Sequence, residues 1–346
     1  MSSILERCGI PKKILIIRIR QVGDILMSTP LVKSLRLNFP DAEIHFMALD
    51  RLLSLVVNNP HIDRVWRWPN KYKDPVPFIK LLFELRRENF DVCIDLECKA
   101  NTAVFTWLLG ATSRISRYKK NRSFFYTDYI PPASNDDFSA VQQLNAMIPL
   151  GVEPTLSTLE CVPEQHDFEK AEEVLRQLGT NRKIIAVTPV TRRPEYKQWG
   201  EEKFAQVCDY LISQCGYDVL FLWGPGEMKT INKTRSHMKE KDLGDYEMLT
   251  LLETVALLTK VELLFGNDNG VRHLGISAGT PTFAVFGKPL ASNWTPPNEK
   301  RHGFLEHDPG CKRSCHYPRC GTECIRDITA TDTIEKLSAF IELNGL

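Results

Sequence analysis

A carboxylate stands directly after the first apolar run of the chain. Residues 12–20 are expected to form a strand, a Gln-Val-Gly-Asp turn spans 21–24, and a helical pattern follows. Ligands of open α/β sheets bind beyond the carboxyl ends of the strands, so Gly23 and Asp24 are predicted at the mouth of a site. There Asp24 could act as a general base. The ordinary alternative is that Asp24 caps the following helix, and the turn alone leaves both open.

Residues 265–288 predict an anion site. They read as a strand, a polar turn, a short helix and a second strand. Asn267, Asp268 and Asn269 can cap the helix, and Gly270 lets a ligand approach backbone N–H groups that have no partner within the helix. Such a terminus favours anions, a diphosphate above all. A plain cap with a glycine for turn geometry is the alternative.

Cations gather in a third place. Residues 114–122 contain no acid and five bases, Arg114, Arg117, Lys119, Lys120 and Arg122. Together with Arg18 and Arg20 at the end of the first strand, they could attract an anionic acceptor or a membrane surface. An ordinary solvated loop is the alternative, because charge runs usually face water.

Four cysteines lie close together late in the chain, at Cys311, Cys315, Cys320 and Cys324. Their spacing resembles a four-thiolate metal or cluster site, although it departs from the common C-x-x-C pairs. We expect any ion here to be structural, ordering residues 309–326 without taking part in chemistry.

Familiar nucleotide-binding motifs are missing. There is no Gly-x-Gly-x-x-Gly after the first strand and no Gly-x-x-x-x-Gly-Lys-Ser/Thr anywhere, which argues against dinucleotide oxidoreductases and P-loop NTPases. No Asp-x-Asp pair is present to hold a divalent ion. A leaving diphosphate would therefore be stabilised by helix N–H groups and by Lys197, in the polar loop 189–199 that follows a predicted strand.

Length and composition set the class of protein. A chain of 346 residues with 43% hydrophobic content fits about two globular domains. The net charge of +1 gives no argument for nucleic acid as a partner. Residues 1–11 lack the apolar core of a signal peptide, and no window approaches the ~18 apolar residues of a membrane span, so we expect a cytosolic protein with reduced thiols.

Strand and helix patterns alternate in both halves of the chain. Strands are predicted at 43–48, 64–68, 91–96, 183–188 and 218–223, and helices at 52–57, 78–87, 103–109, 141–148, 167–178, 201–214, 227–239 and 249–259. Short connections between them indicate mainly parallel sheets, so the fold class is α/β. The segment 130–165 reads as a crossover. We therefore predict domains over 1–160 and 161–346 with a cleft between them.

Taken in order, several motifs resemble glycosyltransferase family 9, the ADP-heptose:lipopolysaccharide heptosyltransferases. They are Arg-Gln-Val-Gly-Asp-Ile-Leu-Met-Ser-Thr-Pro from 20, Lys-Gln-Trp-Gly-Glu-Glu-Lys-Phe-Ala from 197, Trp-Gly-Pro-Gly-Glu from 223 and Asn-Asp-Asn-Gly-Val-Arg-His-Leu-Gly from 267. The resemblance runs over most of the chain. It implies the GT-B type of fold, in which an acceptor-binding and a nucleotide-sugar-binding Rossmann-like domain face each other across a cleft. A terminal helix, expected at 333–341, would pack back on the first domain.

The resemblance also implies roles for single residues. Asp24 matches the catalytic base, Lys197 the lysine on the donor phosphates, and Glu227 the acid near the adenosine ribose. Residues near the donor sugar and diphosphate are matched by Asp268, Gly270 and His273, with Asn269 beside them. Three positions depart from the family pattern, Asn269, Arg272 and Lys288, and they bear on the donor sugar more than on the fold.

The function implied is an inverting, metal-independent transfer of a heptose from ADP-heptose to the lipopolysaccharide inner core. No cofactor is expected beyond a structural ion at the cysteines. The anionic core acceptor would bind at Arg18, Arg20, Arg117 and Arg122, and the protein would touch the inner membrane surface peripherally. The alternatives are a related GT-B transferase using another nucleotide sugar and a non-catalytic protein that binds a nucleotide or a metal.

Overall fold

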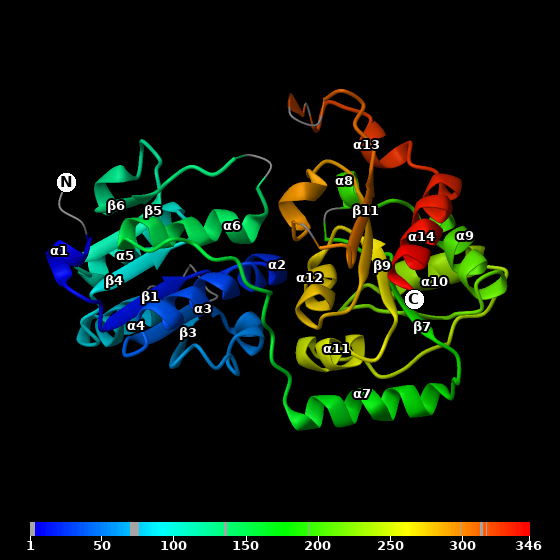
Figure 1. The fold of residues 1–346 in the computed structure, drawn as a ribbon, viewed down its shortest axis with the longest axis horizontal. Coiled ribbons are helices and arrows are strands. Elements are labelled where there is room, and N and C mark those ends of the chain that lie inside the picture. The colour runs from blue at the N-terminus through cyan, green and yellow to red at the C-terminus, as the bar shows by residue number, and fades with distance from the viewer. Residues whose placement is uncertain are drawn as a thin grey trace. The chain divides into compact units, whose positions relative to one another are not determined.

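The computed structural model describes residues 4–69, 76–134, 137–192, 194–297, 299–311, 314–315 and 317–346. The chain divides into two compact units, Met1–Val162 and Pro163–Leu346. Each unit is a parallel sheet covered by helices (Figure 1). None of the helices in the described ranges is long and apolar enough to cross a membrane.

The first sheet is built around β1. Its strands run in the order β3-β2-β1-β4-β5-β6, and all neighbours pair in parallel. They span Lys13–Ile17 (β1), Glu43–Leu49 (β2), Arg64–Trp68 (β3), Val92–Asp95 (β4), Ser113–Arg117 (β5) and Asp128–Ile130 (β6). Ile14 pairs with Ile44 on one side and with Val92 on the other, and all three are fully buried. β1 is an unbroken apolar run because a strand covered on both faces has no polar side.

Helical segments connect these strands. They are Ile4–Cys8 (α1), Val22–Leu26 (α2), Thr29–Asn38 (α3), Asp50–Leu55 (η1), Val76–Arg87 (α4), Ala100–Leu109 (α5), Ser123–Phe125 (η2), Ser139–Leu144 (α6) and Asn145–Leu150 (η3). The helix predicted at 52–57 is the 3-10 segment η1, and the one predicted at 141–148 is divided between α6 and η3. η3 contains Pro149, which has no backbone N–H for an α-helical hydrogen bond.

The basic segment 114–122 is only partly a loop. β5 includes both Arg114 and Arg117. The side chain of Arg114 donates hydrogen bonds to the carbonyl oxygens of Phe125 (2.9 Å) and Ala111 (2.8 Å), so its charge fastens the chain around β5. The spacing of basic residues in the sequence did not show that Arg114 has a structural role, unlike its exposed neighbours.

The second sheet has the order β11-β10-β9-β7-β8, again with parallel neighbours throughout. Its strands span Ile184–Thr188 (β7), Asp218–Phe221 (β8), Leu263–Asn267 (β9), Thr282–Phe286 (β10) and His302–Glu306 (β11). The predicted strand, turn, helix and strand within 265–288 are β9, α12 and β10. Strand β11 was not predicted, because it is a short edge strand with mixed polarity.

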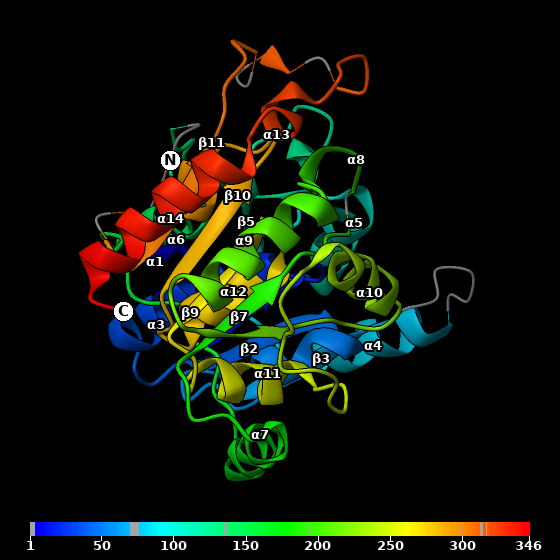
Figure 2. The ribbon, with the colours of Figure 1, turned by 90° about the vertical axis from the view of Figure 1, so that its right-hand side faces the viewer.

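Helices of the second unit complete the fold. They are Gln165–Leu178 (α7), Pro194–Lys197 (α8), Glu201–Ser213 (α9), Met228–His237 (α10), Leu251–Leu258 (α11), Gly270–Ser277 (α12), Ala291–Trp294 (η4), Glu323–Arg326 (α13) and Ala330–Asn344 (α14). Figure 2 shows α14 and α9 lying over the second sheet, and α14 packs against α9 and β11. Its expected contact with the first unit stays a prediction.

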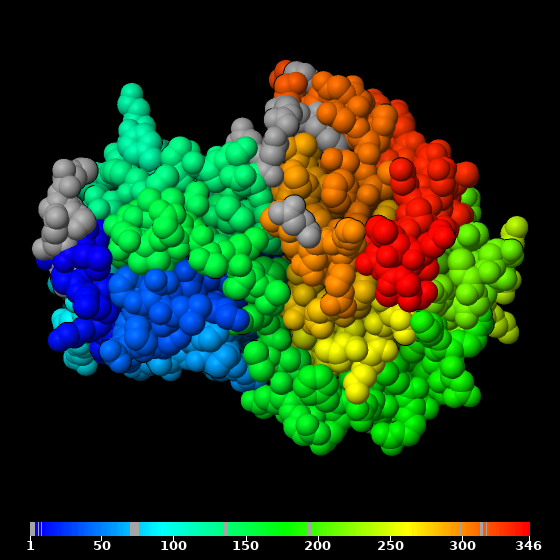
Figure 3. Space-filling view, in the orientation of Figure 1, coloured from blue at the N-terminus to red at the C-terminus, as the bar shows by residue number. Residues whose placement is uncertain are grey.

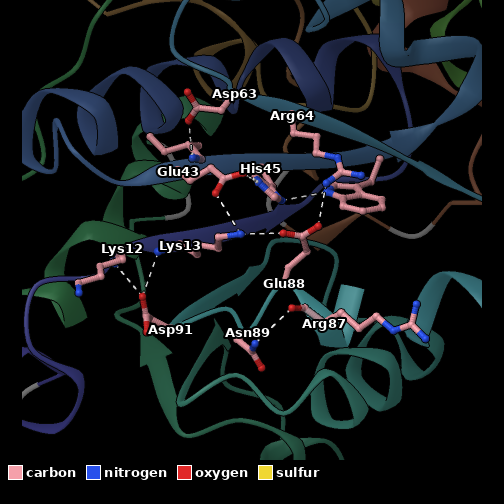
Figure 4. A network of polar contacts seen from close by, with 12 residues as sticks. Lys12, Lys13, Glu43, His45, Asp63, Arg64, Arg87, Glu88, Asn89 and Asp91 are labelled. Atoms are coloured by element: carbon pink, nitrogen blue, oxygen red, sulfur yellow. Dashed lines mark hydrogen bonds and ion pairs between the residues drawn. The ribbon is translucent and has the colours of Figure 1, made fainter. Parts of the chain in front are cut away.

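An ionic network holds the amino edge of the first sheet (Figure 4). Lys13 Nζ lies 2.7 Å from Glu88 Oε2 and 3.0 Å from Glu43 Oε2, and Glu43 Oε1 lies 2.7 Å from Nε2 of the buried His45. Trp66 donates to His45 Nδ1 (3.0 Å), which leaves the proton of the neutral ring on Nε2. Ligating atoms of Glu43, His45 and Glu88 lie within 4.8 Å of one another, but the ammonium group of Lys13 already bridges the two carboxylates.

Strands β7 and β9 approach each other closely. The chain segments that follow the two strands therefore lie side by side. Thr188 pairs with Gly266 across the two strands. A Cβ atom at Gly266 would lie 2.6 Å from the carbonyl oxygen of Thr188 and closer still to its Cγ2. Only glycine fits at this point of the sheet.

We therefore expect Gly266→Ala to destabilise the protein by about 1–3 kcal/mol, because the contact is with backbone that the ladder holds in place. Thermal unfolding should occur several degrees lower. Gly224→Ala is the control, because a Cβ there would meet only the carboxylate end of the Glu227 side chain, at 3.3 Å. Equal melting temperatures for the two variants would contradict this account of the β7–β9 contact.

Candidate functional site

In the first unit, the predicted base lies at the carboxyl end of β1. Asp24 is the third residue of α2, and the N-cap position belongs to Gln21. The alternative that Asp24 caps this helix is therefore wrong. Its Oδ1 instead lies 2.7 Å from Arg18 Nη2. Gln21 has a positive φ of 66°, a conformation that side chains rarely adopt and that often marks functional turns.

Glu97, which follows β4, organises the same edge of the sheet. Its Oε1 accepts hydrogen bonds from the backbone N–H groups of Ile19 (3.1 Å) and Arg20 (3.2 Å) and lies 3.9 Å from Arg18 Nη1. Its Oε2 lies 2.6 Å from Lys99 Nζ. Glu97 was not among the predicted site residues, although the rule that predicts a site at Asp24 also covers residues that follow β4.

The two carboxylates differ in protonation behaviour. Desolvation raises the pKa of Asp24 above its ordinary value, and the charge of Arg18 offsets this only in part. Burial also acts to raise the pKa of Glu97, but the hydrogen bond from Lys99 and the charge of Arg18 bring it below its ordinary value. Environments that separate two acids in this way are typical of sites where one of them accepts a proton.

The other predicted cations of this unit have different surroundings. The guanidinium group of Arg117 lies near Arg18 and Asp24, and its pKa is lowered first by partial burial and then by the like charge of Arg18. Arg122 donates a hydrogen bond to the carbonyl oxygen of Cys98, so part of its role is structural. Arg20 is half-buried, and its backbone N–H donates to Glu97 Oε1.

In the second unit, the predicted anion site lies at the start of α12. Asn269 is the N-cap, and its side chain accepts a hydrogen bond from the backbone N–H of Arg272 (3.2 Å). Its amide nitrogen donates to Thr188 Oγ1 and to the carbonyl oxygen of Val190, both at 2.9 Å. The capping prediction for Asn269 is confirmed, and Gly270 is the first residue of the helix. The remaining N–H groups of the first turn have no partner within the helix, which favours an anion there.

Lys197 lies beside this helix start. Its Nζ is 2.5 Å from Asp268 Oδ2, and the Asp268 side chain is almost fully buried. Lys197 Nζ also lies 5.9 Å from the centre of the Trp294 ring. Lys197 is the last residue of α8, and the chain just after it is held in place because the backbone N–H of Trp199 donates to Asn267 Oδ1 (3.1 Å). An ammonium group has three protons, so the ion pair with Asp268 leaves donors for a ligand.

His273 and Arg272 follow within the same helix. His273 is buried, and its Nδ1 has no hydrogen-bond partner among the described residues. Burial, followed by the charges of Arg272 and Lys197, lowers the pKa of His273 well below its ordinary value, so the ring is neutral. Arg272 donates to the carbonyl oxygen of Trp294 (2.8 Å) and to Thr295 Oγ1 (3.1 Å), and burial lowers its pKa to about 10. Arg272 therefore stays charged and positions η4.

Glu227 occupies a separate turn after β8. Its Oε2 accepts a hydrogen bond from the backbone N–H of Gly224 (2.7 Å), which closes the turn before α10. Trp223 directly precedes this turn, and its ring centroid lies 4.4 Å from that of Tyr246. No contact within the described residues links Glu227 to Lys197. A surface hollow between α9 and α10 contains none of the predicted site residues.

The metal site predicted at the four late cysteines stays a prediction. The pKa of Cys311 is raised first by partial burial and then by Cys315 and Cys320, so both of these thiols lie near enough to Cys311 to act on its charge. However, within the described residues the group of three ligating atoms closer than 4.8 Å is the one at Glu43, not one at these cysteines.

Two groups of side chains thus converge, one in each unit. Asp24, Arg18 and Arg117 lie together at the carboxyl edge of the first sheet, and Lys197, Asp268, Asn269 and His273 lie together at that of the second. The first group can remove a proton beside bound anions. The second can hold a negatively charged leaving group with a helix N-terminus and an ammonium group.

Comparisons with known proteins agree with this chemistry. The sequence model of glycosyltransferase family 9 (heptosyltransferase) matches residues 78–321. Lipopolysaccharide heptosyltransferase 3 of Escherichia coli is 25% identical over 286 residues, which cover 79% of this chain and 83% of that protein.

Solved structures share the fold at lower identity. A glycosyl transferase family 9 protein from Veillonella parvula superimposes with a TM-score of 0.86 at 21% identity, covering 96% of this chain and 98% of its own. For the E. coli ADP-heptose LPS heptosyltransferase II the TM-score is 0.77 at 19% identity, covering 96% and 100%. The iron-containing dodecameric glycosyltransferase TibC of enterotoxigenic E. coli gives 0.56 at 15% identity, covering 96% and 77%.

The family match spans more than half of the chain, and the solved neighbours share its two α/β units in a GT-B type of fold. The chain therefore belongs to glycosyltransferase family 9, the heptosyltransferase family, and is a glycosyltransferase.

Proposed function

We propose that this protein transfers a heptose from ADP-heptose to the inner core of lipopolysaccharide, with inversion at the anomeric carbon and without a catalytic metal ion. The names of its relatives support this substrate pair, since they include lipopolysaccharide heptosyltransferases and an ADP-heptose enzyme. The observation that carries the proposal is the position of Asp24. It is an acid with a raised pKa beside Arg18, and it lies at the carboxyl edge of the first sheet.

The donor would bind to the second unit. Its diphosphate would lie against the first turn of α12, where Gly270 allows close approach, and Lys197 would donate to it. The charge of the departing ADP grows during transfer, so these donors would stabilise the transition state more than the ground state. Glu227 would bind a ribose hydroxyl, and Asp268 would keep Lys197 in place.

The acceptor would bind to the first unit. An inverting transfer needs one base to take the proton of the attacking hydroxyl, and Asp24 would supply it. The acceptor phosphates and carboxylates would be held by Arg18, Arg20, Arg117 and Arg122. Work on such an acceptor would place the protein in the cytoplasm, at the inner membrane surface, with no nucleic acid as partner.

Asp24→Asn is expected to lower kcat by ~10²-fold or more in transfer from ADP-heptose to a heptose-deficient core, while binding of the donor and thermal stability persist. The wild-type kcat/KM should fall as the pH decreases through the pKa of Asp24, because the base becomes protonated. This decrease should lie above the ordinary 3.8 of aspartate. Asp50→Asn, at an exposed carboxylate, should change nothing. Near-normal turnover of Asp24→Asn would remove Asp24 from the mechanism.

Lys197→Met is expected to weaken donor binding by about tenfold or more and to lower kcat, because it keeps the side-chain stem but removes the ammonium group. The change also leaves buried Asp268 without its ion pair, so melting should be compared with Lys197→Met/Asp268→Asn. If the double variant regains stability but not donor affinity, Lys197 contacts the donor. Lys183→Ala, at the amino end of β7, is the matched control. Wild-type donor affinity in Lys197→Met would refute the assignment.

We further propose a structural metal ion at the cysteine loop. The convergence of Cys311, Cys315 and Cys320 supports it, and one solved neighbour in fold is described as iron-containing. Protein purified without oxygen should contain stoichiometric zinc or iron, and Cys315→Ser with Cys320→Ser should lose the metal while keeping donor affinity. Absence of both metals in the wild type would reject the proposal.

A further inference from the structure

Helix α5 has an apolar outer face. Its sequence, Ala-Asn-Thr-Ala-Val-Phe-Thr-Trp-Leu-Leu, contains no charged residue. Thr102, Phe105 and Thr106 are buried, and Val104 and Trp107 are exposed. A helix on the surface of a sheet normally carries polar residues on its outer side. The outer side of α5 therefore lacks the composition of a face that meets only water.

The neighbouring helix α4 carries a second apolar stripe. Leu81 and Leu85 are its buried residues. Ile79 and Phe83 are spaced four apart on the opposite side, and Phe83 is 61% exposed. Because α4 packs against α5, the two exposed stripes belong to one side of the unit.

The short segment η2 extends this surface. Phe124 is 77% exposed, and its ring centroid lies 6.0 Å from that of Trp107. Phe125 lies 6.2 Å from Trp107 and packs against Phe124 at 5.7 Å. These three rings support one another, so the exposed aromatic groups are held in place by side-chain packing.

Cations border the apolar surface. Between Lys99 and Thr127 the sequence contains no acidic residue. Lys119 and Lys120 are exposed in the loop between β5 and η2, which projects from the first unit in Figure 3. Arg86 and Arg87 are exposed at the end of α4. The one acid on α4, Glu84, has Lys80 at 4.0 Å.

We propose that the outer face of α4, α5 and η2 docks the protein onto an anionic phospholipid bilayer. Exposed Trp and Phe side chains insert at the level of the lipid headgroups, and the bordering lysines and arginines bind the negative surface. Neither part suffices alone, because a few exposed apolar groups give weak binding and isolated surface charges are screened by salt. The combination selects a charged membrane over a neutral one.

The position of this face gives docking a consequence for the proposed reaction. The loop that carries Lys119 and Lys120 follows Arg117, the last residue of β5, and Arg117 lies near Asp24. A sugar acceptor anchored in the same bilayer would therefore approach the carboxyl edge of the first sheet from the membrane side. This consequence rests on the proposed function, whereas membrane docking itself does not require it.

The test is co-sedimentation of the full chain with vesicles of phosphatidylethanolamine and phosphatidylglycerol, compared with phosphatidylcholine vesicles. The wild type should bind the anionic vesicles, and Phe83→Ser/Trp107→Ser/Phe124→Ser should bind at least about tenfold more weakly. Lys119→Glu/Lys120→Glu should lower binding to anionic vesicles and make that binding less sensitive to salt. Leu37→Ser, at a residue of α3 that is 71% exposed, is the matched control and should bind like the wild type.

Trp107 offers a direct measure of insertion. Brominated lipids should quench part of the tryptophan fluorescence in the wild type, and Trp107→Phe should keep binding but lose that quenching.

Wild-type vesicle binding by the triple variant, or no binding by the wild type, would overturn the proposal. The proposal would also be overturned if sedimentation equilibrium showed the wild type to be a dimer and the triple variant a monomer. That result would assign the face to contact with a second copy of the chain. With a delipidated acceptor, the triple variant should keep the turnover of the wild type, because this acceptor does not require a membrane. If the proposed transferase function is wrong, the wild type itself will show no turnover, whatever the result of the vesicle experiment.

Discussion

Parallel strand pairing is the constraint on which both halves of the candidate site depend. In a parallel sheet every strand delivers its following residue to the same edge. Asp24 after β1 and Glu97 after β4 both lie beside Arg18 for this reason, although more than seventy residues separate them in the chain. Thr188 at the end of β7 and Asn269 after β9 meet in the same way, and Gly266 lets their strands approach closely. The apolar strands that form the two cores therefore also assemble the polar groups.

The two edges of the first sheet use charge differently. At the amino edge, the hydrogen bond from Lys13 lowers the pKa of Glu88, and the bond to Glu88 raises the pKa of Lys13, so both groups stay charged and inert. At the carboxyl edge, burial outweighs the pairing of Asp24 with Arg18, and the pKa of this acid rises. Carboxylates that are fully paired with cations hold a sheet edge together. A buried carboxylate whose desolvation is only partly offset by a cation can exchange a proton.

Local sequence patterns predicted much of this arrangement. The strand, turn and helix around Asp24 and the cap at Asn269 depend on short-range rules, and the structure contains both. Interactions that depend on the direction of a side chain could not be predicted from the sequence. Nothing in the spacing of Arg114 and Arg122 shows that one ties Phe125 to β5 and the other binds the carbonyl of Cys98. The ring of Trp294 comes to Lys197 through a connection that only the folded chain defines.

Pattern recognition also misjudged some elements for physical reasons. Helix periodicity over 52–57 does not distinguish an α-helix from the tighter η1, because both bury residues three or four apart. The exposed aromatic face of α5 reads in sequence as an ordinary buried helix, since periodicity cannot show which side of a helix meets other elements.

The central claim is that a nucleotide diphosphate binds at the start of α12, and a crystal structure of the protein with ADP-heptose tests it most directly. The account predicts diphosphate oxygens within hydrogen-bond distance of the backbone N–H groups of Gly270 and Val271 and of Lys197 Nζ, with the Asp24 carboxylate making no contact with the phosphates. A diphosphate bound at the Gly23–Asp24 turn of the first unit, or at Arg18 and Arg117, would contradict it.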